Sequence, residues 1–366
     1  MIQNKRNNSF SAEVIDENVK EEDISLSSYR VPFKSIANGS VSIPTITEFK
    51  NLKQYEDELQ PRYVTNSDLG TSSFPFEHNR IKLQNAIGSN NYINANWITR
   101  NSDECNYDSA VYSSNIPYRD IRFAISRTPL SATMKHHYHM IRECMFDTVI
   151  GFSEEVNKNP FLVGKVYHFD DLTVKVLNRI DMTLNLTRTE MTLFDKNAPE
   201  YQINHKFIYF EFTAWPKNEI RNFQDTEFIV SAICMIRDEM MRGSRSLPKV
   251  LVHDSFGGVR GSAVFLAMYQ LMNEVDEAFK ADDMLKQYVK DADVFGTINR
   301  LREDRKNMVD EFITYKLLHQ CLAYYGSNRK TLSDLVFKTY KKKVTGSNID
   351  EEYVMYQNSE NVVNVN

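Results

Sequence analysis

Apolar positions in the middle of the chain follow two different periods. Residues 172–177 and 207–212 are rich in β-branched and aromatic side chains, which predicts strands. Residues 225–242 and 264–275 place apolar side chains three and four positions apart, which predicts helices with one buried face. The short apolar run 249–253 has the pattern of a buried strand directly before the second helix. These patterns together predict a mixed α/β domain with a curved sheet.

The two ends of the chain lack this periodicity. Residues 1–45 are rich in Asn, Ser, Glu and Lys and poor in aromatic residues, so we expect a disordered tail there. Residues 329–366 turn first basic and then polar and acidic, which predicts a helical extension that ends in a second tail. A single domain over residues 46–328 is the simplest division of what remains.

Composition narrows the class of protein. With 42% hydrophobic and 25% charged residues among 366, the chain is globular rather than wholly disordered or collagen-like. Since no stretch approaches the roughly 20 apolar residues that a bilayer requires, we expect no integral membrane segment. The net charge of −5 provides no overall basic field, so we expect no nucleic-acid partner.

Cysteine and histidine usage points to neither disulfides nor metal. The four cysteines lie far apart and lack CxxC spacing, which favours a reducing cytoplasmic location. A histidine cluster at His136, His137 and His139 has no surrounding zinc-binding pattern, so a polar helix face is expected there. We therefore predict no metal and no cofactor.

The segment between the strand at 249–253 and the following helix has the composition of an anion-binding loop. A loop in this place directs backbone N–H groups toward one point, and the helix N-terminus adds partial positive charge. An arginine at the end of the loop can hold an oxyanion through two parallel hydrogen bonds. The candidate anion-binding residues are Ser255, Gly257, Gly258, Arg260 and Gly261.

This loop resembles the His-Cys-x5-Arg signature of the protein tyrosine phosphatase family, with Asp254 at the cysteine position. Four further segments match family motifs in the same order: PFEHNRIKL with YINA (75–83 and 92–95), AISRTPL (124–130), FTAWP (212–216), and VFG with LREDR and MV (294–309). The resemblance covers most of the central block. It implies the fold of that family, a central twisted mixed β-sheet flanked by α-helices.

The resemblance also implies which positions would carry catalysis, and most of these are substituted. Asp254 replaces the nucleophilic cysteine. Lys217 replaces the general acid, and a lysine is a weak acid at neutral pH. Asp310 and Thr314 stand where two glutamines help to place the hydrolytic water. The signature arginine is kept as Arg260.

Two further features differ from the family: the segment that recognises the substrate, and the composition of the anion-binding loop. The tyrosine that packs on the substrate ring falls on Gly70, with Tyr63 as the alternative. Val259 stands where the family has a glycine, and would be strained if that position required a positive φ. We expect the Asp254 carboxylate to turn onto Arg260 in an ion pair that fixes the loop. The alternative leaves this arginine available to a phosphorylated or acidic partner residue.

Two functions follow from the resemblance. The favoured one is a catalytically inactive phosphatase-like domain that binds and regulates a kinase or a phosphoprotein and shields it from active phosphatases. The alternative is an active phosphatase with atypical chemistry, in which Asp254 attacks phosphate. Nematode pseudophosphatases that act at egg activation, in the cytoplasm and at the cell cortex, are the nearest suggested group. Insect-virus members of the phosphatase family are a second suggested group of inactive forms.

Overall fold

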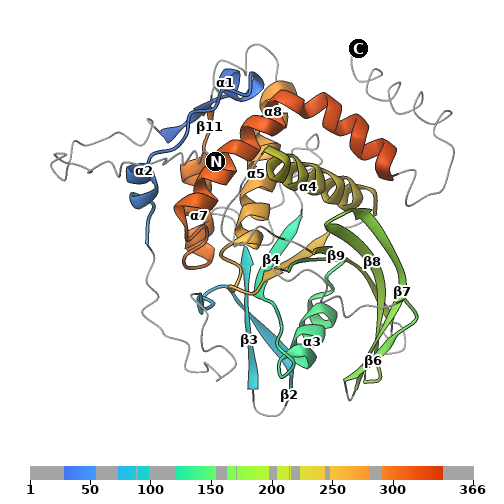
Figure 1. Ribbon diagram of the computed structural model, residues 1–366. Helices are drawn as coiled ribbons and strands as arrows, with labels where there is room; N and C mark the ends of the chain where they lie inside the picture. The colour runs from blue at the N-terminus through green and yellow to red at the C-terminus, as the bar shows by residue number, and fades with distance from the viewer. Residues whose placement is uncertain are drawn as a thin grey trace, which may run out of the picture.

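The protein is described by a computed structural model. It covers residues 29–54, 73–87, 90–98, 121–153, 163–169, 171–197, 204–213, 215, 223–243, 248–280 and 291–340. Within these ranges the core of the molecule is one large sheet with helices on both faces (Figure 1).

The central sheet has nine strands in the order β2-β3-β4-β10-β5-β9-β8-β7-β6. The four adjacent strands β4, β10, β5 and β9 run parallel, and the remaining neighbours pair antiparallel. The predicted mixed, curved sheet is therefore confirmed. The strand bounds, in sheet order, are Arg80–Ile87, Asn90–Ile98, Arg122–Arg127, Lys249–Asp254, Thr148–Phe152, Asn204–Phe212, Leu186–Asp195, Leu172–Thr183 and Val166–Phe169.

Burial along the strands explains their sequences. All five residues of β5 are buried, as expected for a parallel strand covered on both faces. In β7, Leu172, Val174 and Val176 are buried, while Lys175 and Leu177 between and beyond them are exposed. The two-residue period seen in the sequence is thus the period of a strand with one packed face.

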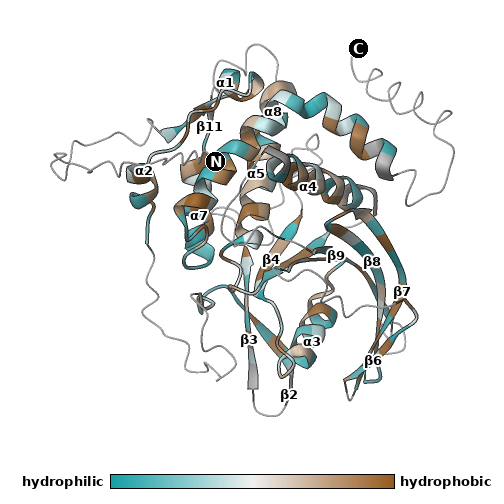
Figure 2. Cartoon of the chain, in the orientation of Figure 1, coloured by the Kyte–Doolittle hydropathy of each residue, from teal (hydrophilic) through white to brown (hydrophobic). Residues whose placement is uncertain are grey.

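Helices cover the two faces unequally. α3 (Met134–Cys144) packs beside β2 and β7 on one face (Figure 1). The other face carries α4 (Phe223–Gly243), α5 (Gly261–Lys280), α7 (Val294–Asp304) and α8 (Phe312–Tyr340). Figure 2 shows apolar residues recurring along the strands and along the helices that cover the sheet.

The N-terminal boundary of the domain lies earlier than the sequence predicted. β1 (Val31–Pro32) pairs with β11 (Asp291–Ala292), and α1 (Phe33–Ala37) and α2 (Ile46–Lys50) contact α8. Ile36 is fully buried and lies so close to α8 that a Cβ at Gly326 would meet its side chain at 2.2 Å. The expectation of a disordered tail to residue 45 is therefore wrong from residue 29 onward. Residues 1–28 lie outside the described chain.

The C-terminal boundary moves in the opposite direction. α8 continues past residue 328, and its Leu332 and Val336 are buried in the main core. The helical extension is confirmed to Tyr340, but at least its first part belongs to the domain. In the portion of the chain with described coordinates, no helix has the length and apolar character to cross a membrane.

The histidine cluster is not a polar helix face. His137 and His139 are buried in α3. Burial holds the pKa of His137 well below its ordinary value, so the ring is neutral at pH 7. His139 lies 3.3 Å from the Asp171 carboxylate and joins α3 to the turn before β7. Among the described residues, no group of three or more metal-binding side chains is present.

Candidate functional site

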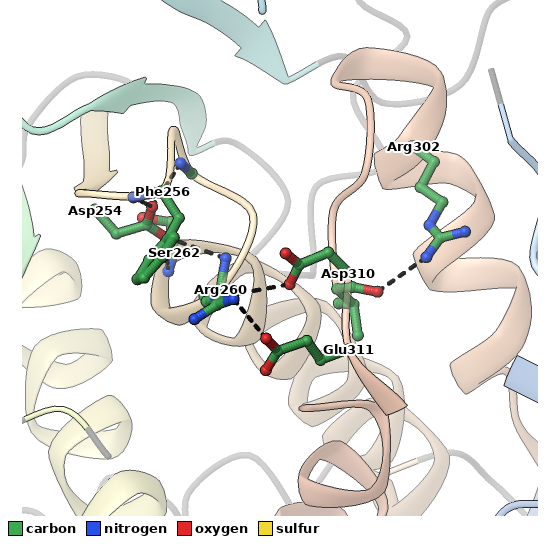
Figure 3. Close-up of polar contacts among 9 residues, drawn as sticks. Asp254, Phe256, Arg260, Ser262, Arg302, Asp310 and Glu311 are labelled. Carbon is green, nitrogen blue, oxygen red and sulfur yellow. Dashed lines mark hydrogen bonds and ion pairs between the residues drawn. The ribbon is translucent and has the colours of Figure 1, made fainter. Parts of the chain in front are cut away.

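The site is built where β10 ends and α5 begins. β10 lies between β4 and β5, and its last residue is Asp254. We call residues 254–262 the signature loop, and its final two residues open α5. The carboxyl ends of parallel strands are where α/β proteins place ligands, because the loops there face one crevice. Figure 3 shows the side chains gathered at this edge.

The Asp254 carboxylate is buried inside the loop and accepts hydrogen bonds from four backbone N–H groups. Oδ1 accepts from Phe256 at 3.0 Å and from Gly258 at 2.6 Å. Oδ2 accepts from Arg260 at 3.2 Å and from Ser262 at 3.1 Å. The loop therefore does direct its amides to one point, as the sequence predicted. An internal carboxylate occupies that point (Figure 3).

Two glycines give the loop its curvature. Gly257 and Gly258 have φ values of 82° and 88°, which glycine adopts without the steric cost that other residues meet. A Cβ at Gly258 would also lie 2.5 Å from the Ile125 side chain on β4. Val259 is not among the residues with positive φ, so the strain expected there is absent. Among the described residues, the β-branched side chain with positive φ is instead that of Val309, at 58°.

Arg260 does not pair with Asp254, and the expected ion pair is wrong. Its Nη2 donates to Oε1 of Glu311 at 2.5 Å, and its Nε lies 3.6 Å from Oδ1 of Asp310. The guanidinium carbon stands 3.7 Å from the centre of the Phe256 ring, a cation–π distance. The retained arginine is thus held by one aromatic ring and two carboxylates (Figure 3).

The segment that carries these carboxylates is fixed to the rest of the domain. Arg302 on α7 donates from Nε to the Met308 carbonyl and from Nη2 to the Val309 carbonyl, each at 2.9 Å. The Val309 N–H donates to the carbonyl of Val259 in the signature loop, also at 2.9 Å. Burial raises the pKa of Asp310 to about 6, and the neighbouring guanidinium of Arg260 only partly offsets that effect.

A second buried arginine joins the signature loop to the sheet. Arg305 is fully buried and donates from Nε to the Gly257 carbonyl at 2.5 Å. It also donates to the side-chain oxygens of Asn96, at 2.6 Å, and of Asn94 on β3. Asn94 and Arg305 lie within the matched motifs and Asn96 directly follows one, but the sequence predicted no role for any of them. Two asparagines at alternate positions among the apolar residues of the second half of β3 were the available signal.

His253 precedes the signature loop and is neutral. It is buried, its Nδ1 lies 3.0 Å from the Thr128 hydroxyl, and burial lowers its pKa to about 4. Its ring stacks on Tyr209 and meets His137 edge-on. An uncharged imidazole adds no positive charge beneath Asp254, whose hydrogen-bond donors described above are all backbone N–H groups.

The other predicted site residues are distributed as follows. Ser255 is exposed on the loop, and at Gly261 a Cβ would lie 2.7 Å from the Phe152 ring. Thr314 is buried in the first turn of α8, and its N–H donates to the Glu311 carbonyl at 3.1 Å. Lys217 lies outside the described residues. The same is true of Gly70 and its alternative Tyr63.

The fold and the signature loop agree with a comparison against known families. The model of the protein-tyrosine phosphatase family matches residues 70–324, more than half of the chain. The chain belongs to the protein-tyrosine phosphatase family.

Individual relatives are distant. The chain is 23% identical to human phosphatidylinositol phosphatase PTPRQ over 273 residues, and 23% identical to its rat counterpart over 351 residues. It is 22% identical to rat receptor-type tyrosine-protein phosphatase V over 257 residues. These alignments cover 73%, 89% and 68% of the chain, but only 10%, 14% and 13% of the three relatives.

Proposed function

We propose that this chain is a catalytically inactive phosphatase-like domain that acts by binding a protein partner. The observation that carries the proposal is the position of Asp254, whose two carboxylate oxygens accept four backbone N–H groups of the signature loop. In an active family member these amides would serve the phosphoryl group.

Asp254 is poorly suited to the atypical chemistry of the alternative hypothesis. Each carboxylate oxygen already accepts two hydrogen bonds, which withdraw electron density from the atom that would attack phosphorus. A phosphate brought to the loop would have to displace the carboxylate from its donors. At an effective dielectric constant near 20, two like charges about 4 Å apart repel by about 4 kcal/mol.

The other catalytic functions are also compromised. Arg260, the retained oxyanion ligand, is neutralised by Asp310 and Glu311. Asp310 stands at the first of the two glutamine positions and presents a carboxylate in place of an amide. Loss of general acid catalysis at Lys217 would alone lower the rate by about 10²–10⁴.

A turnover assay tests the inactivity. We expect the purified chain to release no product from p-nitrophenyl phosphate or phosphotyrosine peptides, with Asp254→Ala indistinguishable from wild type. Turnover that Asp254→Ala abolishes would contradict the proposal and favour nucleophilic attack by the carboxylate. In that case, mass spectrometry after acid quenching would detect an acyl-phosphate at Asp254.

The partner we propose is a protein kinase or a phosphoprotein, met in the cytoplasm or at the cell cortex. The support is the resemblance to inactive family members such as the nematode egg-activation group. Affinity capture of the intact protein from its own cells, with Arg260→Ala alongside, tests this proposal. Capture of neither a kinase nor a phosphoprotein would contradict it.

A further inference from the structure

Arg260 is the signature-loop residue that the resemblance assigns to phosphate binding and that is retained, and carboxylates surround it. The guanidinium lies directly against two carboxylates, those of Asp310 and Glu311. The Asp254 carboxylate instead accepts hydrogen bonds from backbone amides, including the backbone N–H of Arg260.

We propose that Asp310 and Glu311 are built-in counter-ions that occupy Arg260 in place of a phosphate monoester. The arginine then binds such a ligand more tightly as each of these carboxylates is neutralised. This inference rests on the proposed function, because it describes how the same site, once inactive, treats phosphate. It implies that a partner is recognised at neutral pH without a phosphate on Arg260.

The backbone next to the two counter-ions is held in place. Arg302 holds the two carbonyls that precede Asp310, and the Val309 N–H is bonded to Val259. Because the backbone on both sides of the contact is attached to the signature loop or to α7, little backbone entropy is lost when the ion pairs form. An incoming phosphate would therefore compete with groups that are already positioned.

Solvent access also favours the internal pair. The side chains of Arg260, Asp310 and Glu311 are 22%, 20% and 38% exposed. Charges at this depth are screened less than surface charges, so a guanidinium already paired here has little attraction left for a further anion. The Phe256 ring covers one face of the guanidinium and leaves fewer directions of approach.

The test is calorimetric titration of the full chain with phenyl phosphate at pH 7.5. We expect wild type to bind weakly or not at all. We expect Asp310→Asn/Glu311→Gln to bind at least ten-fold more tightly, and Arg260→Ala in that background to abolish the gain. The matched control is Glu303→Gln/Asp334→Asn, which removes two negative charges from exposed positions on α7 and α8 and should leave binding at the wild-type level.

Several outcomes would overturn the inference. These are equal affinity of wild type and the double variant, a gain that survives Arg260→Ala, or an equal gain in the charge control. Should the double variant fail to fold, Glu311→Gln alone takes its place, since this side chain is the most exposed of the three. The gain in affinity then expected is at least three-fold, and its absence would equally overturn the inference.

Assaying the same variants with p-nitrophenyl phosphate separates the two proposals. Hydrolysis by wild type would refute inactivity, whereas the binding results concern only the counter-ions.

Discussion

At the scale of single residues, Asp254 shows how a loop can hold a buried carboxylate at its centre. Its two oxygens match four backbone donors, and a buried charge is tolerable when it is hydrogen-bonded in this way. Through these hydrogen bonds the carboxylate contributes to the free energy of unfolding of the domain.

Asp254→Asn should destabilise the protein by about 1–3 kcal/mol. An asparagine has one acceptor oxygen, so its NH₂ group would face two loop N–H donors and leave them unpaired. Urea unfolding at pH 7.5 measures the change. The control is Asp181→Asn, whose carboxylate is 76% exposed and should change stability by less than about 0.5 kcal/mol. An Asp254→Asn protein as stable as wild type would contradict this prediction.

Glu211 on β9 is a second buried carboxylate, and its pKa gives stability a pH dependence. Burial raises that pKa from 4.5 to about 7, with Arg179 opposing the shift. A raised carboxyl pKa favours the folded state below the unfolded value, and the advantage is lost as pH rises through about 7.

Glu211→Gln should therefore gain stability relative to wild type between pH 5.5 and pH 8, by an amount on the order of 1–3 kcal/mol. Paired urea titrations at the two pH values give the difference. A difference between variant and wild type that stays constant across this interval would show that Glu211 does not titrate there.

At the scale of elements, the signature loop is shaped by segments far from it in sequence. Arg305, at the end of α7, supports the loop from beneath through the Gly257 carbonyl and reaches β3 through Asn94 and Asn96. The loop, the strand and the helix end are therefore expected to lose their structure together.

Arg305→Met should cost about 3–5 kcal/mol, because three buried acceptors would lose a charged donor at once. Thermal unfolding should show a clear drop in Tm. Arg300→Met on the same helix provides the comparison, since its side chain is 41% exposed, and should change stability by less than about 1 kcal/mol. Similar Tm values for the two variants would contradict a supporting role for Arg305.

At the scale of the whole molecule, the chain before the predicted domain start is part of the fold. Val31 and Ile36 are buried, and Glu48 on α2 is hydrogen-bonded to Tyr315 on α8. The N-terminal segment and the C-terminal helix thus stabilise each other, although they are far apart in sequence.

Deletion of residues 1–45 should lower the free energy of unfolding by about 3 kcal/mol or more. The reason is that full burial of each side chain such as Val31 or Ile36 contributes about 1.5–3 kcal/mol. Deletion of residues 1–28, which removes none of the described contacts, is the matched control. Equal urea midpoints for the two truncations would show that residues 29–45 contribute nothing.

The difference between prediction and structure has a physical pattern. The long periodic segments were predicted well: 225–242 corresponds to α4 and 207–212 to most of β9. The five-residue helix α1 is too short to display a helical period, so its segment was mistaken for a tail. The signature loop was recognised because its residues are consecutive.

The partners of Arg260 could not be predicted in the same way. Glu311 lies 51 residues further along the chain, and only the fold brings the two side chains together. The sequence suggested Asp254 as the partner because it is close and oppositely charged. It could not show that backbone amides would satisfy this carboxylate first.

The contacts of Asp254 and those of Arg260 are separate, and this separation affects how the domain could evolve. A substitution that placed cysteine at position 254 would free the backbone N–H groups of the signature loop from the Asp254 carboxylate. Arg260 would still be paired with Glu311 and Asp310. On the proposed function, that one substitution would therefore leave phosphate turnover low. A return to phosphatase activity would require changes at both sets of contacts, which favours a lineage that keeps the domain for binding.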